Sequence, residues 1–80
     1  MKELQLKIVS PEDILFDGKV RVVKLPGTEG DFSILHGHAP LISSLRAGDI
    51  EYESEGTAEK VTIQGGFIEV KQNVVTVCVE

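Results

Sequence analysis

Residues 25–45 read LPGTEGDFSILHGHAPLISSL, and this stretch decides how we interpret the rest of the chain. A Pro-Gly pair and an acidic, glycine-containing segment mark tight connections. Pro40 biases the residue before it toward an extended backbone. The apolar runs at residues 32–35 and 41–45 are too short for ordinary helices. The stretch therefore predicts short strands that change direction at loops, and those loops hold both histidines of the chain.

Apolar and polar residues alternate on either side of this stretch. Leu4, Leu6 and Ile8 alternate with polar neighbours, which is the period of a half-buried strand. Turn residues then separate further alternating runs. Three hairpins are expected. The first joins residues 14–16 to residues 20–25 around Asp17-Gly18, and the last joins residues 67–71 to residues 74–79 around Gln72-Asn73. The middle one joins residues 50–53 to residues 60–64 around Gly56, with Lys60 opposite the glutamates.

Short strands spaced about eight to twelve residues apart are typical of an all-β sandwich or barrel. Eighty residues make one domain, over residues 1–80, and the sequence offers no helical window. Because the chain is 41% hydrophobic and lacks Trp, we expect an aliphatic core. Cys78 is the only cysteine and forms no internal disulfide, so we expect a small core or interface residue in a reducing compartment.

Charge and hydropathy exclude several kinds of partner. The formal net charge is -5, and the eight Lys and Arg residues are spread singly, so we expect neither nucleic-acid binding nor insertion into lipid. No apolar run reaches the roughly 20 residues that cross a bilayer. Residues 1–10 alternate and do not form an export signal. The sequence predicts a soluble, unexported domain.

A metal site is the alternative interpretation that we keep open. His36 and His38 form a His-x-His pair similar to the first ligands of the cupin metal motif. That motif then needs a glutamate, where this chain has Ile42 and Ser43, and it needs a further histidine. Two imidazoles leave the site short of the usual three or four ligands. No Ser lies in a Gly-x-Ser-x-Gly motif, and residues 27–30 lack the lysine of a phosphate loop.

The same stretch is better suited to protein binding than to catalysis. Polar groups lie close in sequence to apolar ones, and polar groups around an apolar centre are typical of protein interfaces. A catalytic group is not required for that role. The polar residues are Thr28, Glu29, Asp31, His36 and His38, and the apolar residues are Phe32, Leu35, Leu41 and Ile42.

Three motifs in order give the chain a family resemblance. They are PGTEG at residues 26–30, GHAPL at residues 37–41, and GGF at residues 65–67 followed by Glu69-Val70. With these motifs, residues 4–79 resemble the epsilon subunit family of F-type ATP synthases. The resemblance implies a sandwich of two antiparallel sheets with roughly ten short strands.

The resemblance also implies a function and two sets of contact residues. It implies a non-catalytic central-stalk subunit that binds the gamma subunit and the c-subunit ring and couples proton translocation to ATP synthesis. Thr28, Glu29, Gly30 and Asp31 would contact the c ring. His38, Ala39, Pro40, Leu41 and Ser43 would contact gamma. An acidic loop suits a ring that presents basic loop residues.

Two departures from the commoner family pattern limit what is carried over. Relatives often have Pro where this chain has His36, which implies a less rigid start of that loop. The helical hairpin that many relatives carry after the sandwich is expected to be absent, so we expect no ATP binding, no inhibition of ATP hydrolysis and no cofactor. The implied location is peripheral, at the cytoplasmic face of the cell membrane or its matrix or stromal equivalent.

Overall fold

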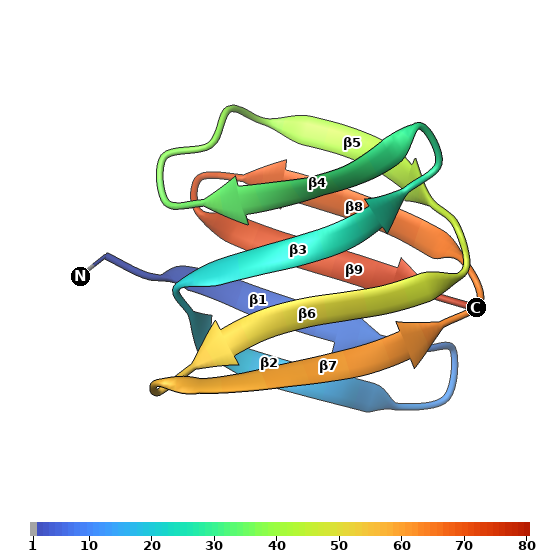
Figure 1. The fold of residues 1–80 in the computed structure, drawn as a ribbon, viewed down its shortest axis with the longest axis horizontal. Coiled ribbons are helices and arrows are strands. Elements are labelled where there is room, and N and C mark those ends of the chain that lie inside the picture. The colour runs from blue at the N-terminus through green and yellow to red at the C-terminus, as the bar shows by residue number, and fades with distance from the viewer. Residues whose placement is uncertain (1) are drawn as a thin grey trace.

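The computed structural model describes residues 2–80, which form strands joined by short turns (Figure 1). No helix occurs within that range. The strands are β1 (Leu4–Val9), β2 (Ile14–Val20), β3 (Val22–Gly27), β4 (Gly30–Leu35), β5 (Leu41–Leu45), β6 (Gly48–Ser54), β7 (Thr57–Ile63), β8 (Gly66–Lys71) and β9 (Val74–Val79).

The strands lie in two layers that face each other. One layer has the order β2-β1-β9-β8-β5, and the other contains β4, β3, β6 and β7 (Figure 1). The layers are continuous at one corner, where Gly27 of β3 pairs with Leu45 of β5. All paired strands are antiparallel except β1 and β9, which run parallel. The prediction of an all-β sandwich is confirmed, and the parallel pair is a feature that the sequence did not reveal.

Alternating side chains from both layers fill the space between them. The burial of residues along β1 and β8 alternates strictly, as expected for strands with one face on the core. At the side where β2 faces β6, the rings of Phe16 and Tyr52 lie 4.4 Å apart between centroids. The buried core is almost entirely aliphatic and comprises Leu4, Leu6, Ile8, Val20, Val23, Leu25, Ile34, Leu45, Ile50, Tyr52, Ile63, Ile68, Val70, Val75, Val77 and Val79.

The predicted hairpin around Asp17-Gly18 is wrong. Both residues lie inside β2, where Gly18 pairs with Leu6 of β1. A Cβ at Gly18 would lie 3.1 Å from the Phe16 ring, so this glycine makes room for an aromatic side chain inside a strand. The first hairpin is therefore β1–β2, and β3 crosses to the other layer, where it pairs with β4 and β6.

The two later hairpins are confirmed. The β6–β7 turn holds Glu55 and Gly56 at positive φ, and the β8–β9 turn holds Gln72 and Asn73 at φ of 51° and 63°. Two successive residues at positive φ match the right-handed twist of a two-residue hairpin. Lys60 pairs with Glu51 in the register, as expected, although its ammonium group forms its ion pair with Asp49 at 3.8 Å.

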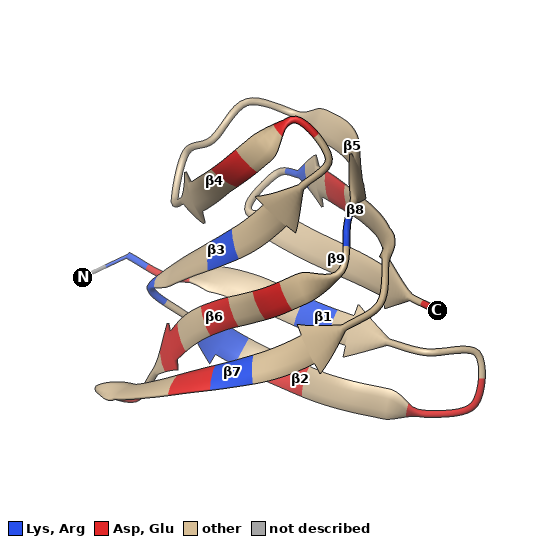
Figure 2. Ribbon diagram, turned by 45° about the vertical axis from the view of Figure 1, so that its right-hand side comes forward, with Lys and Arg blue, Asp and Glu red and all other residues tan. Residues whose placement is uncertain are grey.

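Charged residues of both signs are dispersed over the surface. Lys and Arg lie singly on β1, β3 and β7, among acidic residues that are most frequent on β6 and near the β3–β4 turn (Figure 2). This distribution contains no basic stripe of the kind that neutralises a phosphate backbone. Over residues 2–80, no helix has the length and hydropathy of a membrane span.

Candidate binding surfaces

The turn between β3 and β4 carries the residues that the resemblance assigns to the c ring. Thr28, Glu29, Gly30 and Asp31 are all exposed at one end of the sandwich. Gly27 permits the tight turn, because a Cβ there would lie 2.5 Å from the Gly30 carbonyl oxygen and 2.7 Å from the Phe32 ring. The sequence thus builds a compact turn that projects a short acidic segment into solvent.

The β3–β4 turn is fastened to the end of β5 and the residue that follows it. The Thr28 amide donates to the Ser44 carbonyl oxygen at 3.2 Å, and the Arg46 amide donates to the Pro26 carbonyl oxygen at 2.8 Å. The hydroxyls of Thr28 and Ser44 share a hydrogen bond at 3.0 Å. These contacts lie on either side of the point where Gly27 of β3 pairs with Leu45 of β5, and they hold the base of the turn.

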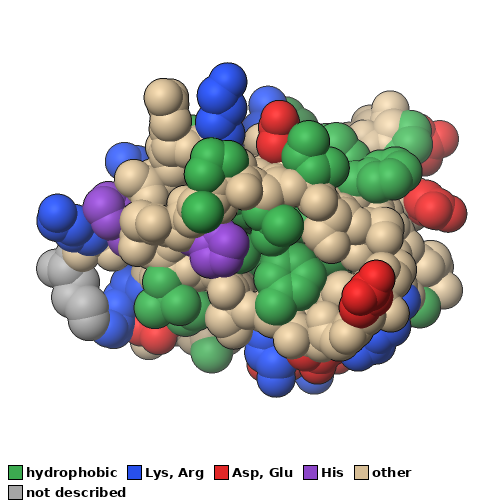
Figure 3. Space-filling model, turned by 90° about the horizontal axis from the view of Figure 1, so that it is seen from above, with side chains coloured by type: hydrophobic (Ala, Val, Ile, Leu, Met, Phe, Trp, Pro, Cys, Tyr) green, Lys and Arg blue, Asp and Glu red, His purple; other side chains and the backbone are tan. Residues whose placement is uncertain are grey.

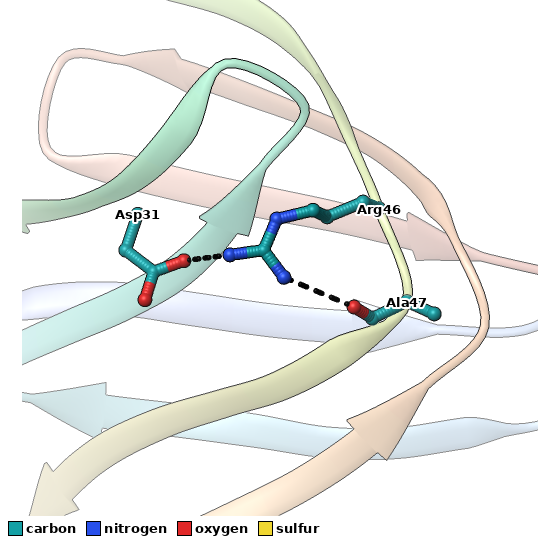
Figure 4. A network of polar contacts seen from close by, with 3 residues as sticks. All are labelled: Asp31, Arg46 and Ala47. Carbon is teal, nitrogen blue, oxygen red and sulfur yellow. Dashed lines mark hydrogen bonds and ion pairs between the residues drawn. The ribbon is translucent and has the colours of Figure 1, made fainter.

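A salt bridge completes this attachment. The Arg46 guanidinium binds the Asp31 carboxylate and also donates to the Ala47 carbonyl oxygen at 3.3 Å (Figure 4). Asp31 lies near the start of β4 and Arg46 in the β5–β6 connection, and their side chains are each about half exposed. One of the two acids predicted to contact the ring is therefore already paired within the domain.

The loop between β4 and β5 carries most of the residues that the resemblance assigns to gamma. His38, Ala39 and Pro40 are exposed. They lie at the end of the sandwich opposite the β3–β4 turn, because β4 separates the two connections (Figure 1). The two predicted contact regions are therefore separate surfaces at opposite ends of β4 and β5.

The β4–β5 loop is anchored by a residue that the sequence analysis did not single out. Asn73, in the β8–β9 turn, accepts a hydrogen bond from the Gly37 amide at its side-chain oxygen, at 2.7 Å. The His38 amide donates to the Leu35 carbonyl oxygen at 3.1 Å, and Nδ1 of His38 donates to the Ala39 carbonyl oxygen at 2.7 Å. The loop is thus held by its own turn and by a neighbouring turn, although it begins with His36 and not with proline.

The metal-site alternative gains no support from this arrangement. Both histidines are exposed, and Nδ1 of His38 is used within the loop. Over residues 2–80, no three or more His, Cys, Asp or Glu side chains are grouped closely enough to hold a metal ion. A site with two histidines and no third ligand is incomplete for zinc or iron.

An exposed apolar stripe crosses the outer face of β5, β8 and β9. Ile42 is 76% exposed and Phe67 is 62% exposed. Ser44 of β5 and Cys78 of β9 are the register partners of Phe67 on either side, and Ile42 is diagonal to it. Hydrophobic side chains extend beside both histidines on the face seen in Figure 3. We call Ile42, Phe67 and Cys78 the apolar stripe.

The apolar stripe changes two predictions made from the sequence. Cys78 is exposed, so it is not a core residue, and only the interface part of that prediction remains. Leu41 and Ser43 lie on the inner side of β5 and are half-buried, while Ile42 between them points outward. Strand alternation contained this information, since Ile68 and Val70 face the core and therefore place Phe67 on the outer face.

The class of protein that this architecture defines is a small β-sandwich domain with two anchored loops and an apolar outer stripe. Residues 3–80 match the family model described as "ATP synthase, Delta/Epsilon chain, beta-sandwich domain". The chain belongs to this family.

Individual relatives agree with the family assignment. The chain is 46% identical over 80 residues to the ATP synthase epsilon chain of Parvibaculum lavamentivorans, covering 99% of this chain and 61% of that protein. It is 41% identical over 75 residues to the epsilon chain of Leptospira borgpetersenii, covering 94% of this chain and 59% of the relative. The chain thus spans about three-fifths of the length of these relatives.

A solved assembly contains a chain of the same fold. A chain in the Euglena gracilis mitochondrial ATP synthase structure, which comprises OSCP, F1 and the c-ring, matches with a TM-score of 0.90 and 25% identity. The match covers 96% of this chain and 50% of the other.

Proposed function

We propose that this chain is a non-catalytic central-stalk subunit of an F-type ATP synthase. In this role it binds the gamma subunit and the c-subunit ring and couples proton translocation to ATP synthesis. Its place is peripheral, at the cytoplasmic face of the cell membrane or its matrix or stromal equivalent. Family membership supports the proposal, together with the two anchored loops at opposite ends of β4 and β5.

The observation that carries the gamma contact is the apolar stripe, which begins with Ile42 near the β4–β5 loop and continues diagonally to Phe67. Large apolar side chains exposed on one face of a small domain mark a surface that is covered in an assembly. Ile42 directly follows the predicted contact residues Pro40 and Leu41, and Phe67 lies diagonally across from Ile42. The gamma contact therefore comprises His38, Ala39 and Pro40 together with the outward side of β5 and β8.

The c-ring contact rests on the β3–β4 turn. The turn is exposed, acidic and held firmly at its base, so docking it onto a partner orders few additional groups. Its negative charge suits a partner that presents basic side chains. The β4–β5 loop and the β3–β4 turn lie at opposite ends of β4, so substitutions within these two connections separate the two contacts.

The gamma contact is tested by replacing an apolar side chain of the stripe. Phe67→Ser removes a large exposed ring without disturbing the core, and we expect it to weaken gamma binding by about tenfold or more. Ile14→Ser is the matched control, because Ile14 is 55% exposed on β2, at the far edge of the layer from β5. Isothermal calorimetry with purified gamma measures both variants. Equal affinities for the two variants and the unmodified chain would exclude the stripe from the interface.

Cys78 supplies a second test without any substitution. Because it is an exposed, free thiol, it reacts with a water-soluble thiol reagent in the folded chain. If gamma covers the apolar stripe, the labelling rate falls on complex formation and returns when the complex dissociates. An unchanged rate in a saturated complex would place gamma on another face.

A further inference from the structure

We propose that Arg46 is a positioning residue for the c-ring contact, and that Glu29 is the free anion that the β3–β4 turn presents to the ring. Arg46 holds Asp31 within the domain and so fixes the direction of the turn. This inference rests on the proposed contact between the turn and the c ring. It assigns different roles to two acids that are neighbours in sequence.

The two acids differ in the structure, because only one of them has an ion-pair partner. The Asp31 carboxylate, near the start of β4, is bound by the Arg46 guanidinium of the β5–β6 connection. Within residues 2–80, the Glu29 carboxylate has no hydrogen-bond or ion-pair partner. The pair of Asp31 and Arg46 carries no net charge, so Glu29 supplies the net negative charge of the turn.

The position of Arg46 is set by the main chain. Its amide donates to the Pro26 carbonyl oxygen, immediately after the point where Leu45 pairs with Gly27. The side chain also donates to the adjacent Ala47 carbonyl oxygen, which orients the guanidinium toward the turn (Figure 4). A planar guanidinium held at its base is suited to keep a carboxylate in one place.

The same strand serves both predicted contact surfaces. β5 presents Ile42 in the apolar stripe and, toward its other end, Ser44 against Thr28. Arg46, which directly follows β5, forms the salt bridge with Asp31. β5 and the residue after it are thus bonded to the β3–β4 turn at one end, and β5 presents Ile42 of the apolar stripe nearer its other end.

A charge swap separates positioning from direct contact. The binding partner is the gamma subunit assembled with the c ring in lipid nanodiscs, and gamma alone gives the reference affinity. We expect Asp31→Asn and Arg46→Gln each to weaken the ring-dependent part of the affinity by about two- to fivefold, the range of an exposed ion pair. The double variant D31R/R46D, which restores a pair of opposite charge, should recover most of the loss.

Glu29→Gln is expected to weaken ring-dependent binding independently, by about threefold or more, and that loss should shrink as salt is raised. Arg21→Gln is the control, because Arg21 and Glu53 form a comparable exposed ion pair elsewhere on the domain, with a distance of 3.1 Å between the guanidinium nitrogen and the carboxylate oxygen. It should leave ring binding unchanged. Urea unfolding midpoints verify that each variant is folded, and exchange of the Thr28 amide reports whether the turn has loosened.

Three results would overturn the inference. If Arg46→Gln binds the ring as well as or better than the unmodified chain while Asp31→Asn binds worse, Asp31 contacts the ring directly and Arg46 only competes with it. A charge swap that fails to recover binding leads to the same conclusion. If the unmodified chain binds gamma alone as tightly as gamma with the ring, the proposed ring contact itself is wrong, and this role of Arg46 falls with it.

Discussion

Asn73 combines a backbone conformation with a side-chain contact. Its φ of 63° belongs to the left-handed region, which Asn tolerates better than most residues, and its side-chain oxygen accepts the Gly37 amide. Asn73→Ala loses both features, and we expect a cost of about 1–2 kcal/mol in the free energy of unfolding. Asn73→Gly keeps the conformation and should cost less. Urea unfolding measures both costs, and equal losses would show that the conformation contributes nothing.

Gly27 is required by space. A Cβ at this position meets the Gly30 carbonyl oxygen and the Phe32 ring, neither of which moves away freely. Gly27→Ala is expected to destabilise the domain by about 1–3 kcal/mol. Ser33→Ala, on the exposed face of β4, is the control and should stay within about 0.5 kcal/mol. A Gly27→Ala variant as stable as the unmodified chain in urea would show that the turn adjusts readily.

At the scale of strands, β6 contributes a residue whose titration reports on packing. Burial between the layers raises the pKa of Tyr52 above its ordinary value, and the charge of Glu59 raises it further. The folded domain therefore holds this proton more tightly than the unfolded chain does. The stabilising contribution is fully present below about pH 10 and is lost as the pH rises through the folded-state pKa.

Tyr52 is the only tyrosine, so its titration is directly visible by absorbance near 295 nm. We expect the free energy of unfolding to fall more steeply above about pH 10 in the unmodified chain than in Tyr52→Phe. The comparison removes the contribution of lysines, which titrate in the same range. Parallel curves for the two proteins would mean that the environment of Tyr52 does not favour its neutral form.

Local patterns predicted most strands and two of the hairpins, but not the pairing of strands that are distant in the sequence. The β8–β9 hairpin follows from Gln72-Asn73 and the alternation around it, and β6–β7 follows from Gly56 in the same way. Asp17-Gly18 is an equally strong turn signal, yet it lies inside β2, because Phe16 covers the glycine from the same strand. The pairing of β1 with β9 joins opposite ends of the sequence, and no local pattern contains that information.

The contact residues were also predictable only in part, because local sequence patterns show loops but not contacts between distant residues. The two loops could be found from their turn residues, and the resemblance assigned them to partners. The contacts of Asp31 with Arg46 and of Gly37 with Asn73 join residues that are distant in sequence. Only the folded chain brings them together, and only the strand register shows that Phe67 lies diagonally across from Ile42 on one face.

For the whole molecule, the apolar stripe has a consequence in the absence of partners. A domain of 80 residues that exposes Ile42 and Phe67 side by side should self-associate weakly as its concentration rises. Sedimentation velocity should show a concentration-dependent increase in the weight-average sedimentation coefficient. Phe67→Ser should reduce this increase, while Ile14→Ser should not. A strictly monomeric chain at millimolar concentration would contradict the prediction.

The parallel pairing of β1 with β9 also bears on how the domain is made in the cell. During synthesis, the hairpin of β1 and β2 leaves the ribosome long before residues 74–79, and until then β1 lacks the neighbour that lies between it and β8. A nascent chain can form the layer of β3, β4, β6 and β7 early, but the other layer has a gap at its centre until translation reaches β9. Completion of the fold is therefore expected to wait until β9 has been made, with the unpaired edge of β1 exposed to chaperones in the interval.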